Sequence, residues 1–146
     1  MKEITIRELK ENPVKLISED WALLTVKDAE KGSCNPMTVS WGSVGELWGA
    51  DMATIYVRES RYTKTLLDNE DYFSLCFFGG KQKEALSFCG SKSGRDCDKV
   101  KETGLTPVYS ENAPYFKEAE IVLICRKKAR TFLGEDLSLI HISEPT

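Results

Sequence analysis

Residues 35–42 read NPMTVSWG, and this stretch is the one from which the fold is most directly predicted. Its apolar residues Met37, Val39 and Trp41 alternate with hydroxyl-bearing ones, which is typical of a strand with one buried face. Gly42 is expected to end the strand. Taken alone, the alternation favours a core role for the apolar side chains, although the mixture also suits a flat aromatic ligand.

Further strands are predicted on both sides of this stretch. The apolar runs lie at residues 21–27 (WALLTVK), 52–57 (MATIYV), 72–78 (YFSLCFF) and 120–126 (EIVLICR). Short helices are expected within residues 60–69, 83–89 and 96–103, while residues 45–49 are expected to be a connection. Strands joined by short turns indicate an antiparallel sheet, and sheets of this size often close into a barrel. The predicted fold class is therefore mainly β, an antiparallel barrel with a few short helices.

Composition restricts the class of protein. The chain has 146 residues, 41% of them hydrophobic and 29% charged, which suits one globular domain. A net charge of −3 argues against a broad nucleic-acid-binding surface. The N-terminus lacks the apolar core of a signal peptide, and no apolar run approaches the roughly 18 residues that span a membrane. We therefore expect a cytoplasmic protein with no membrane partner. The five cysteines form no CxxC pair and are expected to be thiols, with no metal site.

The last ten residues, LSLIHISEPT, resemble an in-frame translation of a sequencing adapter. We predict that residues 1–137 form one domain, incomplete at its C-terminus, and that residues 138–146 are a non-native tail outside the fold. The only histidine, His141, lies in this tail. A Ser-His-Asp or Cys-His mechanism would then lack its base, so no catalytic side chain is predicted.

A first loop rich in anion-binding groups spans residues 58–63, RESRYT, and is called the arginine loop. It offers the guanidinium groups of Arg58 and Arg61 and the hydroxyls of Ser60 and Thr63, beside a predicted helix N-terminus. Ser60 or Thr63 is expected to cap that helix. A solvated turn before a capped helix explains the pattern equally well.

A second loop spans residues 90–96, GSKSGRD, and is called the glycine loop. Small residues permit close backbone approach, and Ser91, Lys92 and Ser93 could bind phosphate oxygens. The loop is not a P-loop, because Lys92 precedes the second glycine. Taken alone, a flexible connection is the favoured interpretation. Lys99, nearby, is expected to be a helix-surface charge or a partner of this loop.

Together, NPMTVSWG, YVRESRYT and GSKSGRDCDKV, the last followed by a Gly-Leu step, resemble the flavin reductase-like or flavoredoxin-like branch of the FMN-binding split barrels. The resemblance extends from about residue 14 to residue 132. The order and spacing of three motifs make it more specific than any one of them.

The resemblance implies a Greek-key split barrel that forms a homodimer and holds FMN in a groove near the subunit boundary. By position, the isoalloxazine and ribityl chain would be lined by Met37, Thr38, Val39, Ser40, Trp41 and Gly42, with Asn35 as an extra contact to the ring. The phosphate would lie at Arg58, Ser60, Arg61 and Thr63. Ser91, Lys92, Ser93 and Arg95 would close over the phosphate or ribityl end.

The function implied is that of an oxidoreductase, moving electrons between NAD(P)H or a protein donor and flavin or a downstream acceptor. The alternative is a non-catalytic split-barrel module that binds flavin or another cofactor. A purely structural domain is least favoured, because two phosphate-suited loops would then be coincidental. Reduction by NAD(P)H would separate the first two functions.

Overall fold

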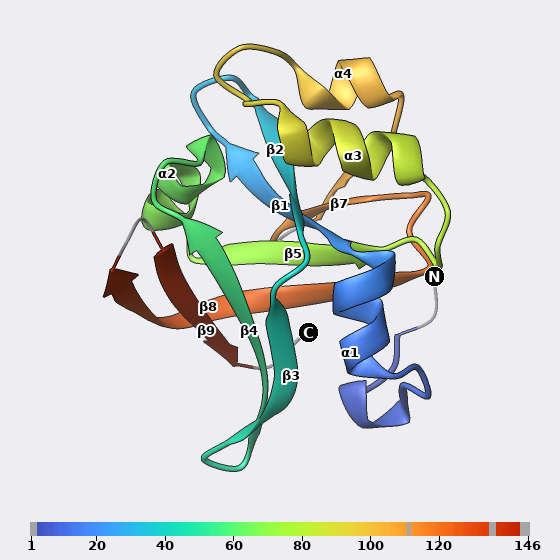
Figure 1. Cartoon of the computed structure of the whole chain (residues 1–146), viewed down its shortest axis with the longest axis vertical. Helices are drawn as coiled ribbons and strands as arrows, with labels where there is room; N and C mark the ends of the chain where they lie inside the picture. Colours follow the sequence, from blue (N-terminus) through green and yellow to red (C-terminus); the bar gives the residue numbers. More distant parts are fainter. Residues whose placement is uncertain (1–2, 111, 135–136, 144–146) are drawn as a thin grey trace.

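The computed structural model describes residues 3–110, 112–134 and 137–143 (Figure 1). In these residues, one antiparallel sheet has the strand order β2-β1-β5-β8-β9-β4-β3. Its strands are β1 (Ala22–Asp28), β2 (Ser33–Val39), β3 (Gly42–Leu47), β4 (Ala50–Arg58), β5 (Tyr72–Phe77), β8 (Ile121–Gly134) and β9 (Leu137–Ser143). A small second sheet pairs β6 (Pro107–Tyr109) with β7 (Pro114–Phe116). The helices are α1 (Pro13–Lys15), α2 (Tyr62–Asn69), α3 (Lys83–Ser91) and α4 (Lys99–Thr103), with a 3-10 turn at Ile6–Glu8 and a π-helical turn at Leu16–Asp20.

The large sheet curls because its two edge strands are consecutive in the chain. β2 ends at Val39 and β3 begins at Gly42, so only Ser40 and Trp41 join the two edges. A two-residue link cannot cross a flat sheet of this width, since strands lie about 4.8 Å apart. Figure 1 shows β2 running on into β3 across the body of the molecule, with α3 and α4 above it. The predicted mainly β, antiparallel class with few short helices is confirmed.

Two apolar clusters use the two faces of the sheet. Met37 and Val39 lie with Leu24, Val26 and Phe73 in the barrel interior, as the alternation in β2 predicted. The second cluster forms outside the barrel, where side chains of β1 and β5 pack against α3 and β7; it includes Leu23, Cys76, Leu86 and Phe116. Burial of both faces explains why β1 is an almost continuous apolar run.

The prediction of a connection at residues 45–49 is wrong. β3 pairs with β4 through Leu47, opposite Ala50, leaving a two-residue turn. Both turn residues, Trp48 and Gly49, have positive φ (56° and 78°), as tight hairpin turns require. β3 is an edge strand whose Gly45 and Glu46 are exposed, so the apolar alternation that predicts a strand is missing.

Residues 137–143 form β9 and enter the barrel, although residues 138–146 were left out of the predicted domain; residues 144–146 lie outside the described part of the chain. The backbone of β9 pairs with β4 on one side and β8 on the other. Both neighbours would otherwise carry unpaired N–H and C=O groups, and the β-branched residues of the segment favour a strand. The non-native origin of residues 138–146 stays a prediction.

Candidate functional site

The three sequence motifs meet at one end of the molecule. The buried Asn35 of β2 donates from Nδ2 to Oγ1 of the buried Thr63 in α2, at 2.8 Å. Gly94 of the glycine loop packs directly on this pair: a Cβ built on it would lie 2.1 Å from Asn35 Oδ1 and 2.7 Å from Tyr62 Cδ2. Only glycine permits so close an approach. The strand, the arginine loop and the glycine loop are therefore in direct contact, and their meeting point is the candidate site.

Arg61 joins the arginine loop to the C-terminal end of α3. Its Nη1 donates to Gly90 O at 3.0 Å and its Nη2 to Cys89 O at 3.2 Å. A cation here satisfies carbonyls that a helix end leaves free and complements the helix dipole. Burial, followed by the charge of Arg58, lowers the pKa of the guanidinium. Arg61 thus positions the start of the glycine loop.

Lys99 reaches the same helix end from α4, and the structure shows that it is not a surface charge. The residue is only 3% exposed, and its Nζ donates to Cys89 O at 2.9 Å. Burial lowers the pKa of this lysine to about 8. Sequence reasoning missed its burial, because lysine is almost never fully buried.

Arg95 and Lys31 bring further positive charge to Tyr62. The Arg95 guanidinium carbon lies 5.4 Å from the Tyr62 ring centroid, and Nη1 donates to Ser60 O at 3.2 Å. Lys31 Nζ lies 5.0 Å from the same centroid and donates to Gly94 O at 2.7 Å. The Tyr62 hydroxyl donates to the buried Asp28 at 2.7 Å, and this bond raises the tyrosine pKa to about 12. No sequence pattern indicated that Lys31, in the β1–β2 turn, would contact the glycine loop.

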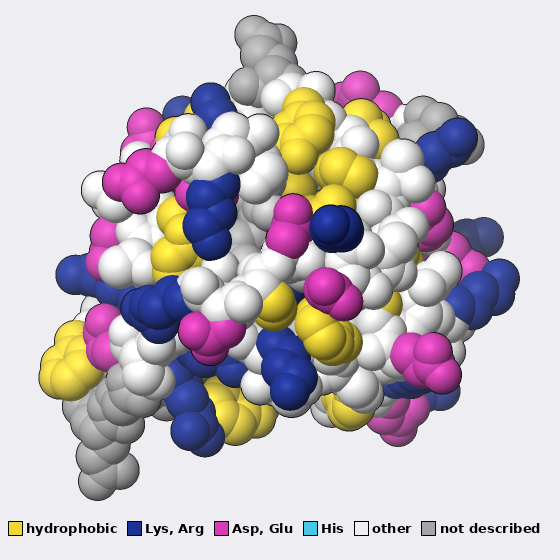
Figure 2. Space-filling model, turned by 90° about the horizontal axis from the view of Figure 1, so that it is seen from above, with side chains coloured by type: hydrophobic (Ala, Val, Ile, Leu, Met, Phe, Trp, Pro, Cys, Tyr) yellow, Lys and Arg dark blue, Asp and Glu magenta, His cyan; other side chains and the backbone are white. Residues whose placement is uncertain are grey.

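Five cations lie on or beside these loops, and we call them the cationic cluster. Its members are Arg58, Arg61, Lys92, Arg95 and Lys99. Among the described residues, none of them forms a salt bridge with a carboxylate. Figure 2 views the end of the molecule that carries α3 and α4, where basic and acidic side chains are interspersed. The cluster is therefore distinguished by its missing ion pairs, not by a uniformly basic surface.

Trp41 and Arg58 form a flat, charged edge at the junction of β2 and β3. Trp41 is 50% exposed, and the Arg58 guanidinium carbon lies 5.6 Å from its ring centroid. An exposed indole beside a cation can stack on a planar ligand.

The remaining predicted site residues mostly support the backbone. The Thr38 hydroxyl donates to Leu86 O, and the Ser91 hydroxyl to Ser87 O at 3.0 Å. Ser93 Oγ accepts from the backbone of Arg95 at 3.1 Å. Met37 and Val39 face the core, Ser40 lies between β2 and β3, and a Cβ on Gly42 would lie 2.4 Å from Thr54 O.

The predicted capping of α2 by Ser60 or Thr63 is wrong. Arg61 is the N-cap residue and makes no side-chain capping bond. The Thr63 hydroxyl lies inside the first turn and is used by Asn35 instead.

The described residues contain neither a metal-ligand cluster nor a membrane-spanning helix. No group of three or more His, Cys, Asp or Glu side chains is arranged to hold a metal ion there. In the same residues, no helix has the length and apolar character that crossing a membrane requires.

Comparison with known proteins gives the family. Residues 15–142 match the model of the flavin reductase like domain. No curated protein matches the sequence. Solved structures with a similar fold include a flavoredoxin from Methanosarcina acetivorans, with a TM-score of 0.74 and 24% identity over 100% of this chain and 74% of that one. An FMN-binding protein from Thermus thermophilus with bound p-hydroxybenzaldehyde gives a TM-score of 0.75 and 19% identity, over 100% and 80% of the two chains. Nitrilotriacetate monooxygenase component B from Bacillus cereus gives a TM-score of 0.75 and 18% identity, over 100% and 80%.

At these identities the structural likeness shows the fold, and it confirms the predicted split barrel. The family model covers most of the chain and confirms the resemblance recognised in its three motifs. The chain belongs to the flavin reductase-like domain family.

Proposed function

We propose that this chain binds FMN where its three motifs meet and acts as an oxidoreductase. It would move electrons between NAD(P)H or a protein donor and the flavin or a downstream acceptor, in the cytoplasm. The observation that carries the proposal is the cationic cluster. Two of its members, the buried Lys99 and the half-buried Arg61, form no salt bridge with a carboxylate among the described residues. Cations in such positions are costly unless a ligand supplies the negative charge.

The phosphate of FMN fits this cluster by charge and by donor type. Arg58 and Lys92 are exposed at the mouths of the two loops, so their side chains can reach a ligand. Guanidinium and ammonium groups are the usual phosphate partners, and charge-assisted hydrogen bonds are stronger than neutral ones. Arg61 and Lys99 would hold the C-terminal end of α3 through its carbonyl groups and add positive potential there.

The flavin ring would lie along the start of β3, on the half-exposed Trp41. Met37 and Val39, buried behind this surface, would support it from the core. Asn35 is oriented by Thr63 and would offer its amide to the flavin from behind the strand. FMN, when bound, supplies the electron-transfer chemistry, so the protein's task is to hold the flavin, tune it and control access. We also propose a homodimer, on the strength of the family resemblance, with light scattering as its test.

An absorbance spectrum tests the function directly. The protein with added FMN, freed of unbound flavin, is expected to show flavin bands that bleach with NADH or NADPH under anaerobic conditions. Bands that persist would favour a protein donor or the non-catalytic module. Absence of bound flavin would refute the proposal for this chain.

The phosphate assignment has its own test in the double variant Arg58→Ala/Lys92→Ala. We expect the Kd for FMN to rise about 100-fold or more, because two charge-assisted hydrogen bonds are lost. Riboflavin, which lacks the phosphate, should bind the variant as it binds the parent. Lys10→Ala/Lys128→Ala removes the same charge from exposed positions elsewhere and should leave both affinities unchanged. Equal FMN affinity in the first variant would exclude these two residues as phosphate ligands.

A further inference from the structure

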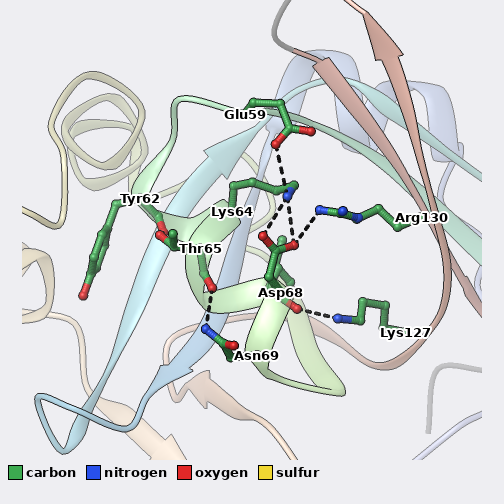
Figure 3. Close-up of polar contacts among 9 residues, drawn as sticks. Glu59, Tyr62, Lys64, Thr65, Asp68, Asn69, Lys127 and Arg130 are labelled. Atoms are coloured by element: carbon green, nitrogen blue, oxygen red, sulfur yellow. Dashed lines mark hydrogen bonds and ion pairs between the residues drawn. The ribbon is translucent and has the colours of Figure 1, made fainter.

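A buried lysine in α2 links the arginine loop to the barrel (Figure 3). Lys64 is only 3% exposed, and its Nζ lies 3.2 Å from Glu59 Oε2. The same Nζ donates to both carboxylate oxygens of Asp68, at 2.8 and 2.9 Å. Both carboxylates are partly solvent-exposed, so Lys64 is the only buried charge of the three.

The far side of this network is fixed to β8. Arg130 Nη1 lies 2.7 Å from Asp68 Oδ1, and the Lys127 ammonium donates to the carbonyl of Leu67. Figure 3 shows these two side chains approaching the C-terminal half of α2 from the long strand. Asp68 thus connects α2 to β8, and Lys64 connects Asp68 to Glu59 in the arginine loop.

The near side of the network ends in the middle of the arginine loop. Glu59 stands between Arg58 and Ser60, and its carboxylate is held by Lys64. A peptide unit leaves only two soft torsions per residue, so fixing the Glu59 side chain restricts the directions of its neighbours. Arg58 is the exposed member of the cationic cluster on this loop.

We propose that Lys64 is a positioning residue for flavin phosphate binding, acting through Glu59 to hold Arg58 and Ser60 in their binding geometry. This inference rests on the proposed function. Glu59 would then assist phosphate binding, although a carboxylate beside an anion site on its own repels the ligand.

The two effects of Glu59 have opposite signs, which makes Glu59→Gln the decisive variant. If Glu59 acts only through its charge, its removal strengthens FMN binding. If it holds the loop, its removal weakens FMN binding, by about fivefold to tenfold for a coupling of ordinary size. The glutamine keeps the shape, and Asp68 still pairs with Lys64, so the melting temperature of the flavin-free protein should change little.

The experiment compares the Kd values of FMN and riboflavin for the parent, Glu59→Gln, Lys64→Met, Lys64→Arg and Glu70→Gln. Glu70 follows α2, forms no salt bridge with the described residues, and so controls for the loss of one negative charge. We expect weaker FMN binding in Glu59→Gln and Lys64→Met, recovery in Lys64→Arg, no weakening in Glu70→Gln, and unchanged riboflavin binding throughout. Should Lys64→Met fail to fold, Glu59→Gln carries the test alone.

FMN affinity in Glu59→Gln equal to or above that of the parent would overturn the inference while leaving the proposed function intact. Equal weakening of FMN and riboflavin would also overturn it, since the effect would then not involve the phosphate. A parent protein that binds neither flavin would overturn the proposed function and this inference together.

Discussion

Two regions of the molecule handle buried positive charge in opposite ways. In α2, the buried Lys64 is matched by Glu59 and Asp68, and Asp68 is shared with Arg130. At the end of α3, the buried Lys99 and the half-buried Arg61 meet only carbonyl oxygens of Cys89 and Gly90. The cation of the first region is paired with carboxylates of the chain, whereas among the described residues neither cation of the second forms a salt bridge.

The difference separates cations that the chain itself neutralises from cations that we propose a ligand neutralises. Taking an ammonium group out of water costs several kcal/mol, and only nearby negative charge recovers much of that cost. Carbonyl dipoles at a helix end recover part of it, with a macrodipole effect of about 0.3–2 kcal/mol. We expect the FMN phosphate to recover the rest of this free-energy cost, so FMN binding should stabilise the α3 end more than it stabilises α2.

Removing both carboxylates that pair with Lys64 in α2 should cause the largest change in the free energy of unfolding. In Glu59→Gln/Asp68→Asn, Lys64 stays buried without an anion, and we expect the free energy of unfolding to fall by about 3–5 kcal/mol. Urea denaturation of the flavin-free protein measures it. Glu19→Gln, which breaks the exposed pair with Lys15, is the matched control and should cost at most about 0.5 kcal/mol. A loss below about 1 kcal/mol in the double variant would mean that Lys64 finds other support.

At the end of α3, which we call the unpaired region, removing the buried cation should raise the free energy of unfolding. In Lys99→Met the desolvation cost disappears, with loss of one hydrogen bond, so the flavin-free protein should be more stable at pH 7 by about 2 kcal/mol. FMN binding should weaken at the same time. A variant that loses stability and keeps its FMN affinity would show that Lys99 has a purely structural role.

The pH dependence sharpens this prediction. Burial lowers the pKa of Lys99 from 10.5 to about 8 in the folded protein, so the unfolded chain binds more protons between these values. Stability then rises with pH over that interval. The cost of burying Lys99 is fully present below pH 8 and is relieved as the pH rises toward 10.5. The advantage of Lys99→Met over the parent should therefore shrink above pH 8, and a constant difference from pH 7 to 9.5 would contradict it.

Sequence patterns predicted the apolar framework well. Alternation placed Met37 and Val39 in the core, and the runs that became β1, β4 and β5 were recognised within a few residues. The start of β8 was also recognised, but the strand extends beyond the predicted run to Gly134. β3 was missed because an edge strand with Gly45 and Glu46 exposed needs no apolar face. β9 was missed because its sequence resembles a translated sequencing adapter and was therefore left out of the fold. Backbone pairing, however, depends little on side-chain identity.

The sequence indicated the three motifs of the candidate site but not the contacts between them. The three motifs predicted that Asn35, Arg58 and Lys92 belong to one site, and this membership stays a prediction. The structure does place Gly94 of the glycine loop against Asn35. The use of Arg61 on the end of α3 and the burial of Lys64 and Lys99 depend on which helices pack together. Those contacts join residues far apart in sequence, and no local pattern reports them.

The contact between the motifs can be tested at Gly94, where the smallest of these effects is expected. A Cβ at this position would lie 2.1 Å from Asn35 Oδ1, so Gly94→Ala must displace the amide or the glycine loop. We expect a loss of about 1–2 kcal/mol in unfolding free energy, together with weaker FMN binding. Gly45→Ala is the control, because a Cβ there would meet no atom within 4 Å.

The pattern across variants then identifies what the glycine loop contributes. If it only covers the core, Gly94→Ala should lose stability and retain its relative preference for FMN over riboflavin. If it carries part of the phosphate site, displacement moves Lys92 and Arg95 as well, and FMN should lose affinity more than riboflavin does. A selective loss in Gly94→Ala, absent from Gly45→Ala, would place the glycine loop with the unpaired region as part of the ligand site.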